Sequence, residues 1–354
     1  MNDLTAEAIG EKWLSLTNEE RSELLSLRRE NQRNKTRSTM RPPAPATATR
    51  TRPRNPDMPK RYATARGREF GERMRAAIAQ AGMTSRQLAD VLGWQEAKVS
   101  DMVNGKGGIT LLDLVLVLGA CRVPEPERKY LLDLFPDTEM DGWWQPHGKC
   151  APVRSGTARS NLAAARTLVS WHPHAVPDLL RTPDHARSLL AASATVPAAE
   201  LDERLRALRE MQELLRNDLH CTFYIHEFTL ELQVGNREEQ VAQLQHLMRM
   251  ASWKRIRILI LPAAAGAHAG MAGPFTLLTF AKYQPLVWIT TENSSLFAEE
   301  EHAIQGYEAV VQALNEISLD EDLSIKWMAR RCVRLQEAAE SQAVSSEDET
   351  FPPL

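Results

Sequence analysis

Residues 84–106 read TSRQLADVLGWQEAKVSDMVNGK, and this stretch predicts two short helices joined by a tight turn. Thr84 and Ser85 offer side-chain oxygens that can cap a first helix, which we expect over about residues 86–92. Gly93 follows, and glycine ends a helix readily because it adopts the left-handed backbone conformation without a steric penalty. The stretch is therefore expected to turn sharply at this glycine.

The second helix is expected over about residues 95–103, where Asn104 and the glycine after it end it. Ala89 is small where two helices must cross closely, and Val99 places a branched apolar side chain in their shared core. Together with Gly93, these residues have the spacing of a helix-turn-helix, in which the second helix enters the DNA major groove. The alternative interpretation is an ordinary fragment of a helical bundle.

Amphipathic helices are expected on both sides of this motif. Their apolar positions are Phe70, Met74, Ala77 and Ile78 before it, and Leu111, Leu112, Leu114, Val115 and Leu118 after it. With these flanks, residues 67–135 resemble the lambda-repressor-like family of regulators, also called the xenobiotic-response-element (XRE) type. The resemblance implies a compact all-α DNA-binding domain, which we place at residues 66–137.

The same resemblance assigns DNA contacts to residues of the two helices. Side chains with base-edge chemistry would be presented by the second helix: Gln95, Glu96, Ala97, Lys98 and Asp101. Phosphate contacts, which position the protein without reading sequence, are expected from Arg75, Ser85, Arg86 and Lys106. For each of these residues the alternative is simple exposure to solvent.

Length and composition exclude several other classes of protein. The 354 residues suffice for two domains and a tail, and 43% hydrophobic residues allow a sizeable core. No apolar run is long enough to cross a bilayer, and no secretion signal opens the chain, so we expect a cytoplasmic protein. The cysteines are far apart, which favours neither a disulfide framework nor a metal site: Cys121, Cys150, Cys221 and Cys332. We expect no cofactor.

Charge is unevenly distributed although the formal net charge is only −3. Residues 28–75 contain fifteen Lys or Arg and four Asp or Glu, a local net charge of about +11. Residues 1–33 predict a helical segment that is either a small appendage or a dimer contact. Residues 34–65 predict a basic, Pro- and Arg-rich disordered linker. The linker is either a plain flexible connection or one whose arginines also bind DNA phosphates, and the two interpretations are compatible.

The remainder of the chain predicts a connector at residues 138–160, an α+β domain at residues 161–338 and an acidic disordered tail at residues 339–354. Helices are expected at residues 161–170, 198–217, 237–251, 299–315 and 324–338. Strands are expected at residues 220–226, 255–261, 275–280 and 286–291, which form a small sheet. The fold class is thus multidomain, an all-α helix-turn-helix domain followed by an α+β domain.

Two motifs of the second domain carry a further resemblance. They are VPDLLRTPDHARSLL at residues 176–190 and LPAAAGAHAGMAGPFTLLTF at residues 261–280. Residues 138–330 look like the effector or partner domain of a large actinobacterial regulator family that includes WhiJ-like and antitoxin-like proteins. The chain departs from the family pattern at several positions, for example His185 in place of a usual Tyr. The resemblance implies that this domain senses a small ligand or binds a small partner protein.

The glycine-rich loop of the second motif is our candidate for the ligand or partner surface, together with one acidic residue after the first strand. The residues are Gly266, His268, Gly270, Gly273 and Glu227. His268 also invites a catalytic interpretation, but no nucleophile or phosphate-binding motif accompanies it, so we expect no enzyme and no catalytic residue.

Taken together, the sequence predicts a cytoplasmic transcriptional regulator that binds double-stranded DNA, with a homodimer as the simplest way to read two half-sites. Its other expected partner is a small-molecule effector or a small protein, and no membrane is involved. The alternative function is an antitoxin-like protein that mainly binds and controls a small partner protein.

Overall fold

The computed structural model describes residues 63–135 and 142–348. The expected N-terminal appendage and most of the basic linker lie outside these residues. Within them the chain forms two compact units. We call residues 63–135, 142–167 and 277–307 the helical unit, and residues 168–276 and 308–348 the sheet unit.

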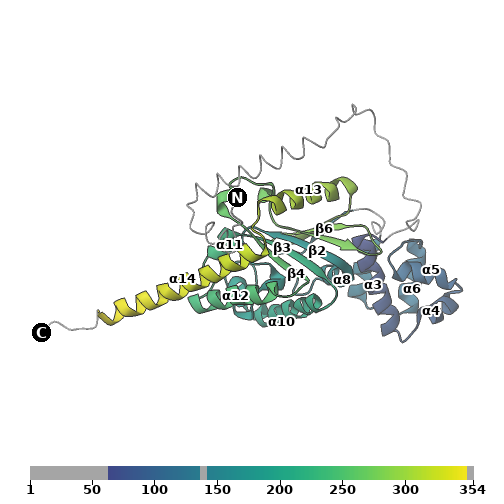
Figure 1. The fold of residues 1–354 in the computed structure, drawn as a ribbon. Helices are drawn as coiled ribbons and strands as arrows, with labels where there is room; N and C mark the ends of the chain where they lie inside the picture. The colour runs from purple at the N-terminus through teal and green to yellow at the C-terminus, as the bar shows by residue number, and fades with distance from the viewer. Residues whose placement is uncertain (1–62, 136–141, 349–354) are drawn as a thin grey trace, which may run out of the picture. The chain divides into compact units, whose positions relative to one another are not determined.

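The first part of the helical unit consists of five helices, as the predicted fold class requires (Figure 1). They are α3 (Ala65–Gln80), α4 (Ser85–Leu92), α5 (Glu96–Val103), α6 (Leu111–Ala120) and α7 (Glu125–Leu134). Thr84 and Gln87 form a reciprocal capping box at the start of α4, and Gly93 ends this helix at φ 65°. The predicted capping residue and the predicted turn are both confirmed.

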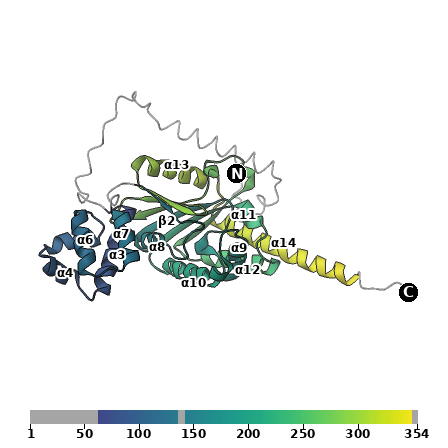
Figure 2. The ribbon, with the colours of Figure 1, turned by 180° about the vertical axis from the view of Figure 1, so that it is seen from behind.

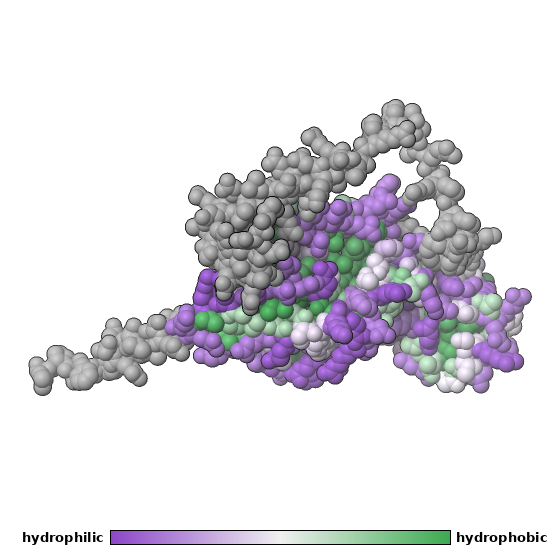
Figure 3. All heavy atoms as spheres, in the orientation of Figure 1, coloured by the Kyte–Doolittle hydropathy of each residue, from purple (hydrophilic) through white to green (hydrophobic). Residues whose placement is uncertain are grey.

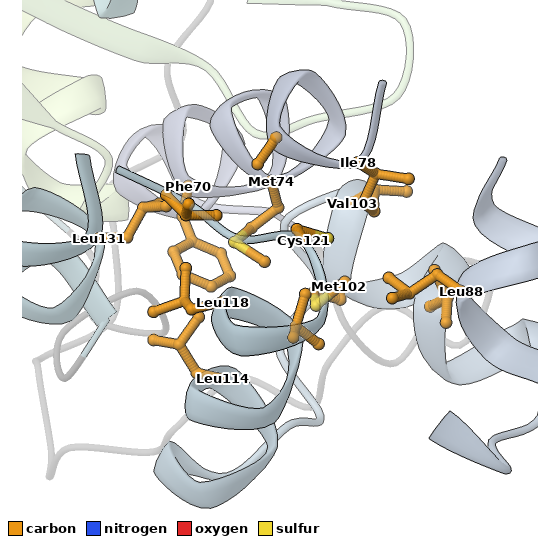
Figure 4. Close-up of a cluster of buried hydrophobic side chains, with 14 of the residues drawn as sticks. Phe70, Met74, Ile78, Leu88, Met102, Val103, Leu114, Leu118, Cys121 and Leu131 are labelled. Carbon is orange, nitrogen blue, oxygen red and sulfur yellow. The ribbon is translucent and has the colours of Figure 1, made fainter. Parts of the chain in front are cut away.

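A single apolar core holds these five helices together (Figure 4). Leu88, Val99 and Met102 from the helix-turn-helix are fully buried, and so is Met74 from α3. Ala89 is 1% exposed at the crossing of α4 and α5, as its small size predicted. Helix α3 and the end of α5 approach closely, since a Cβ on Gly71 would lie 2.6 Å from the backbone nitrogen of Gly105.

The strands form one seven-stranded mixed sheet in the order β1-β7-β6-β5-β2-β3-β4. Their bounds are β1 Trp143–Pro146, β2 Ala165–His172, β3 His220–His226, β4 Ile256–Leu261, β5 Phe275–Phe280, β6 Leu286–Thr290 and β7 Ser294–Ala298. The four predicted strands are confirmed to within one residue. In the helical unit, β1 and β6 both pair antiparallel with β7, while in the sheet unit β3 and β4 are parallel.

The prediction of a helix at residues 161–170 is wrong from residue 165 onward. Helix α8 (Gly156–Ala164) ends at Ala164. Strand β2 begins at the next residue, because Ala165 has an extended backbone with ψ 145°. Alanines before this point favour a helix, but Thr167, Val169 and Trp171 are residues that favour strands. The helix prediction gave too much weight to the alanines.

Helices surround the parallel strands of the sheet unit (Figures 1 and 2). They are α9 (Pro183–Ala191), α10 (Leu201–Gln212), α11 (Glu227–Glu231), α12 (Arg237–Ala251) and α14 (Glu321–Asp348), while α13 (Glu301–Ile317) contributes residues to both units. Short 3-10 segments are η2 Asp178–Leu180, η3 Ala198–Glu200, η4 Glu213–Arg216, η5 Ala263–Ala265 and η6 Ala269–Ala272. Helix α12 packs on both β4 and α14. Helix α14 continues to Asp348, beyond its expected end at residue 338.

Candidate nucleic-acid interface and partner surface

The leading turn of α5, which we call the reading helix, is open to solvent. Gln95 is the N-cap residue, and its side chain makes no capping hydrogen bond. Gln95, Glu96 and Ala97 are all exposed. The described residues therefore leave the predicted base-reading positions of the first turn accessible. Asp101, one turn later, is half-buried.

The protein already binds the amine of Lys98, the one basic residue among the predicted base-reading positions. Its Nζ lies 2.8 Å from Oδ1 of Asp113 on α6 and 4.0 Å from the ring centroid of Trp94. Burial acts to raise the pKa of Asp113, but hydrogen bonds from Lys98 and Thr110 outweigh it and lower the pKa. A DNA base or phosphate must compete with this ion pair for Lys98.

The four predicted phosphate contacts fall into two groups, at opposite ends of the reading helix. Ser85 and Arg86 lie at the start of α4, beside the leading turn, where Nε of Arg86 is 3.3 Å from Oε1 of Glu96. Arg75 and Lys106 belong to the trailing end. Arg75 donates to the carbonyl oxygen of Val103 over 2.7 Å, so it also braces the last turn of α5.

The helix-turn-helix motif carries no net charge. Residues 86–106 contain three basic and three acidic side chains. The excess positive charge of the sequence lies mostly before residue 63, outside the described residues. Sequence-independent attraction to DNA scales with the phosphates that basic groups neutralise. The motif itself is thus suited to positioning and base contact more than to strong electrostatic attraction.

A buried arginine joins α3 to the rest of the helical unit. Arg68 is 8% exposed, and its Nε and Nη2 both donate to Oδ1 of Asn161, over 2.9 and 2.6 Å. Nη2 is also 3.3 Å from Glu299, and the guanidinium lies 5.0 Å from the ring centroids of Phe280 and Tyr283. Burial lowers the pKa of Arg68, against the opposing effect of Glu299.

Sequence reasoning missed this network, because its members are 93 and 231 residues apart. A second group of polar contacts lies beside it. Glu69 accepts a hydrogen bond from Tyr130 over 2.7 Å and forms an ion pair with Arg73 at 3.0 Å. Burial and the neighbouring Glu69 raise the pKa of Tyr130. Both groups fix α3, and through it the reading helix, within the helical unit.

In the sheet unit, Glu227 supports the candidate loop from inside. It is 8% exposed, and its two carboxylate oxygens accept from Nε1 of Trp327 over 3.0 Å and from the backbone nitrogen of Ala263 over 2.7 Å. It therefore ties α14 to the segment that follows β4. This carboxylate is occupied by the protein and is not itself presented to solvent.

His268 lies in an aromatic group that we call the imidazole cluster, made of Trp171, His226 and His268. The two imidazole rings are stacked with centroids 5.7 Å apart, and His268 meets the edge of Trp171 at 5.3 Å. Nδ1 of His226 accepts from the backbone nitrogen of Phe228, and Nδ1 of His268 accepts from that of Gly270. Both neutral rings therefore carry their proton on Nε2.

The glycines around this cluster have different roles. Gly266 and Gly273 have φ values of 63° and 130° with open space around them, so their role is conformational. Gly270 is a close-packing position, because a Cβ there would lie 2.6 Å from Nε1 of Trp171. The indole also donates to the carbonyl oxygen of Gly270 over 2.7 Å.

Two exposed apolar side chains flank the imidazole cluster. Phe228 lies two residues after His226 and is 52% exposed, while Met271 lies three residues after His268 and is 70% exposed. The cluster lies where the parallel strands β3 and β4 end, and the carboxyl edge of parallel strands is a common place for ligand sites. Sequence reasoning missed Trp171 and Phe228, which carry no motif of their own.

Within the described ranges, no group of three or more His, Cys, Asp or Glu side chains is arranged to hold a metal ion. Nor does any described helix have the length and apolarity needed to cross a membrane.

Comparison with known proteins identifies two regions. Residues 69–131 match a family described as "Helix-turn-helix domain". Residues 162–330 match a family described as "Domain of unknown function (DUF5753)". No curated protein and no solved structure is significantly similar to the chain. The first match supports the XRE-like helix-turn-helix, whereas membership of the WhiJ-like and antitoxin-like group stays a prediction.

Proposed function

We propose that this chain is a sequence-specific DNA-binding transcriptional regulator that acts in the cytoplasm. The observation that carries the proposal is the exposed leading turn of α5 on a helix-turn-helix with its corner at Gly93. This geometry is the one with which such motifs enter the major groove. Because the protein would act by binding, we propose no enzymatic activity.

The chemistry of the leading turn suits direct recognition of bases. Gln95 can donate to and accept from adenine, Glu96 can accept from cytosine, and Ala97 can contact a thymine methyl group. The basic residues at both ends of the reading helix would hold the phosphates on either side. One helix offers few base contacts, so we propose that a homodimer reads two half-sites roughly 34 Å apart.

We propose further that the sheet unit controls DNA binding through a small ligand or a partner protein. The support is the imidazole cluster at the carboxyl edge of β3 and β4, with Phe228 and Met271 exposed beside it. Exposed apolar side chains next to polar rings are typical of recognition surfaces. An antitoxin-like protein that mainly binds a small partner is the second candidate, since the same two side chains suit a protein surface.

The function is tested by selecting bound duplexes from a random-sequence library with the full chain, and then measuring affinity against salt concentration. We expect Gln95→Ala and Lys98→Ala to change the preferred sequence. Arg86→Ala should weaken all duplexes alike and reduce the salt slope by about one. Lys254→Ala, an exposed residue of the sheet unit, is the control. If neither library enrichment nor any dependence on Gln95, Lys98 or Arg86 is found, the proposal is wrong.

The two candidates for the sheet unit are separated by co-purification of the full chain with proteins from its own cells. A stoichiometric small protein that is lost in both Phe228→Glu and Met271→Glu supports the antitoxin-like function. Operator binding that changes with a small molecule, with no protein retained, supports ligand sensing.

A further inference from the structure

The outer face of α6 is apolar and uncovered by the described residues. Leu111, Leu112, Val115 and Leu116 are 54%, 69%, 49% and 47% exposed. Residues four apart lie above one another on a helix, so Leu111 with Val115 and Leu112 with Leu116 form two adjacent rows. With Gly119 in the next turn, they form a continuous band that we call the α6 stripe. Figure 3 shows hydrophobic residues at the surface of this helical region.

The opposite face of α6 is already buried in the core. Leu114, Val117 and Leu118 are at most 2% exposed, so the helix is apolar on both sides. A helix that is hydrophobic all round is typically buried all round. Four of the twelve exposed large hydrophobic side chains among the described residues lie on this ten-residue helix. Such a concentration indicates an interaction surface more than scattered exposure.

Charge also favours burial of this band. The only charged residue of α6 is Asp113, and the carboxylate is neutralised by Lys98 at 2.8 Å. The helix therefore has no uncompensated charge that would be desolvated when the α6 stripe packs against another apolar surface.

We propose that the α6 stripe packs against the α6 stripe of a second copy of this chain, across a two-fold axis. This inference rests on the proposed function, in which two reading helices bind two half-sites. A two-fold interface uses the same surface on both copies, so it must be self-complementary. An apolar band without charge meets this requirement, whereas a band with one sign of charge would repel itself.

An antiparallel arrangement of the two helices pairs large side chains with small ones. With the axis between Val115 and Leu116, Leu112 of one copy faces Gly119 of the other. Leu112 is the most exposed residue of the band, and no atom outside the adjacent backbone lies within 4 Å of a Cβ on Gly119. The leucine of one copy thus fits the gap over the glycine of the other. Antiparallel helices also place opposite ends of their dipoles side by side.

The arrangement would make the DNA interface complete only in the dimer. Lys98 of the reading helix is held by Asp113 of α6, so α6 and the leading turn of α5 are fixed to one another. A two-fold axis through the α6 stripe therefore sets the separation and orientation of the two reading helices. The half-site spacing of the operator would follow from this helix pair.

The test measures the oligomeric state of the full chain by sedimentation equilibrium in the absence of DNA. We expect a dimer at micromolar concentration, and we expect Leu112→Glu and Leu116→Glu to raise its dissociation constant at least about 30-fold, as loss of a central interface side chain does. Val333→Glu introduces the same charge at an apolar residue of the sheet unit that is 49% exposed, much as Leu116 is, and should leave the dimer intact.

A charge pair tests the antiparallel register itself. Leu112→Glu and Gly119→Lys should each weaken the homodimer, whereas a mixture of the two variants should form a heterodimer, because the introduced charges then face one another. Neither substitution meets an obstacle in the single chain, since both positions are exposed, and circular dichroism checks that each variant folds. A heterodimer no stronger than either homodimer overturns the register.

A monomeric wild-type chain, or a dimer insensitive to both Leu112→Glu and Leu116→Glu, overturns the interface. These outcomes are distinguishable from failure of the proposed function. Single half-site DNA should bind the two stripe variants and the wild type equally, and that measurement depends on the reading helix alone.

Discussion

Lys98 on the reading helix and Asp113 on α6 form an ion pair of 2.8 Å, and the amine also lies over the ring of Trp94. A residue predicted to contact DNA is thus held in place by the protein before DNA arrives. Such a contact fixes the direction of the side chain, and it must be broken or weakened before the amine can bind a phosphate or base. The strength of this pair should therefore be visible in DNA binding.

Replacing Asp113 by Asn should increase the affinity for non-specific duplex DNA and make its dependence on salt steeper. The substitution removes a negative charge beside the reading helix and releases Lys98 to bind a phosphate. The free energy of unfolding should fall by less than about 1 kcal/mol, because the pair is partly exposed. Fluorescence anisotropy with labelled duplexes at several salt concentrations measures the change. Asp184→Asn alters the net charge equally but lies on α9, and an equal gain in affinity there would contradict a local effect.

Arg68→Met should lower the free energy of unfolding by about 3–5 kcal/mol, because it removes the positive charge beside the buried carboxylate of Glu299. Chemical denaturation of the full chain, followed by tryptophan fluorescence, measures the loss. The double variant Arg68→Met with Glu299→Gln should recover part of it. Arg187→Met breaks an ion pair with Asp202 in which the two side chains are 52% and 70% exposed, and it should cost less. If Arg68→Met is as stable as the exposed-pair variant, the buried network does not stabilise the protein more than an exposed ion pair does.

Gly270→Ala should destabilise the sheet unit by about 1–3 kcal/mol, the usual effect of overpacking a well-filled site. The added methyl group would meet Nε1 of Trp171 and a methyl group of Leu314 at 2.6 and 3.1 Å. Gly306→Ala is the matched control. That glycine lies within α13 with open space around it, so alanine should stabilise by about 0.5–1 kcal/mol. Thermal unfolding of both variants checks the opposite signs.

His185 should make the protein less stable in mild acid. Its side chain is 4% exposed, and neither ring nitrogen has a hydrogen-bond partner among the described residues. Burial, with help from Arg181, lowers its pKa from 6.5 to about 4. Between these values the unfolded chain binds a proton that the folded chain does not. Stability therefore falls as the pH drops from 6.5 towards 4, by about 1.4 kcal/mol per unit.

His185→Phe removes this titration and the unpaired polar atoms while keeping an aromatic ring. We expect the variant to lose about 2 kcal/mol less than the wild type between pH 6.5 and pH 5. Urea unfolding at both pH values gives the comparison. His172, whose pKa is also lowered by burial, remains in both proteins and cancels in the difference. Parallel pH profiles for the two proteins would show that His185 is not the cause.

Local signals in the sequence predicted local structure well. Thr84 and Gly93 act within one turn of their own position, so their roles as cap and corner follow from residue type. Strands β3 and β4 followed from alternating or continuous apolar runs. The strand after α8 was missed because Ala163 and Ala164 lead into it without a loop, so that two opposite propensities meet within a few residues.

The candidate sites could be predicted only where a residue's environment follows from its neighbours in the sequence. Exposure of Gln95 follows from its place at the start of the reading helix. The partners of Lys98 and Arg68 do not, because a sequence does not show which charges meet across a fold. Glu227 illustrates the same limit. One carboxylate oxygen accepts from Trp327, which lies 100 residues further along the chain, and the other accepts from Ala263, which follows β4.

The anchoring of α3 by Asn161 and Glu299 also bears on how such proteins can be recombined. A chain cut after Leu134 would retain every residue of the helix-turn-helix motif but would lose Asn161 and Glu299, so the face of α3 that carries Arg68 would be exposed to water without these partners. Exchange of the motif between related genes would consequently require matching changes at two distant points of the recipient. Recombination at a single junction, which is suited to domains that make no contacts with one another, would here yield a poorly folded hybrid.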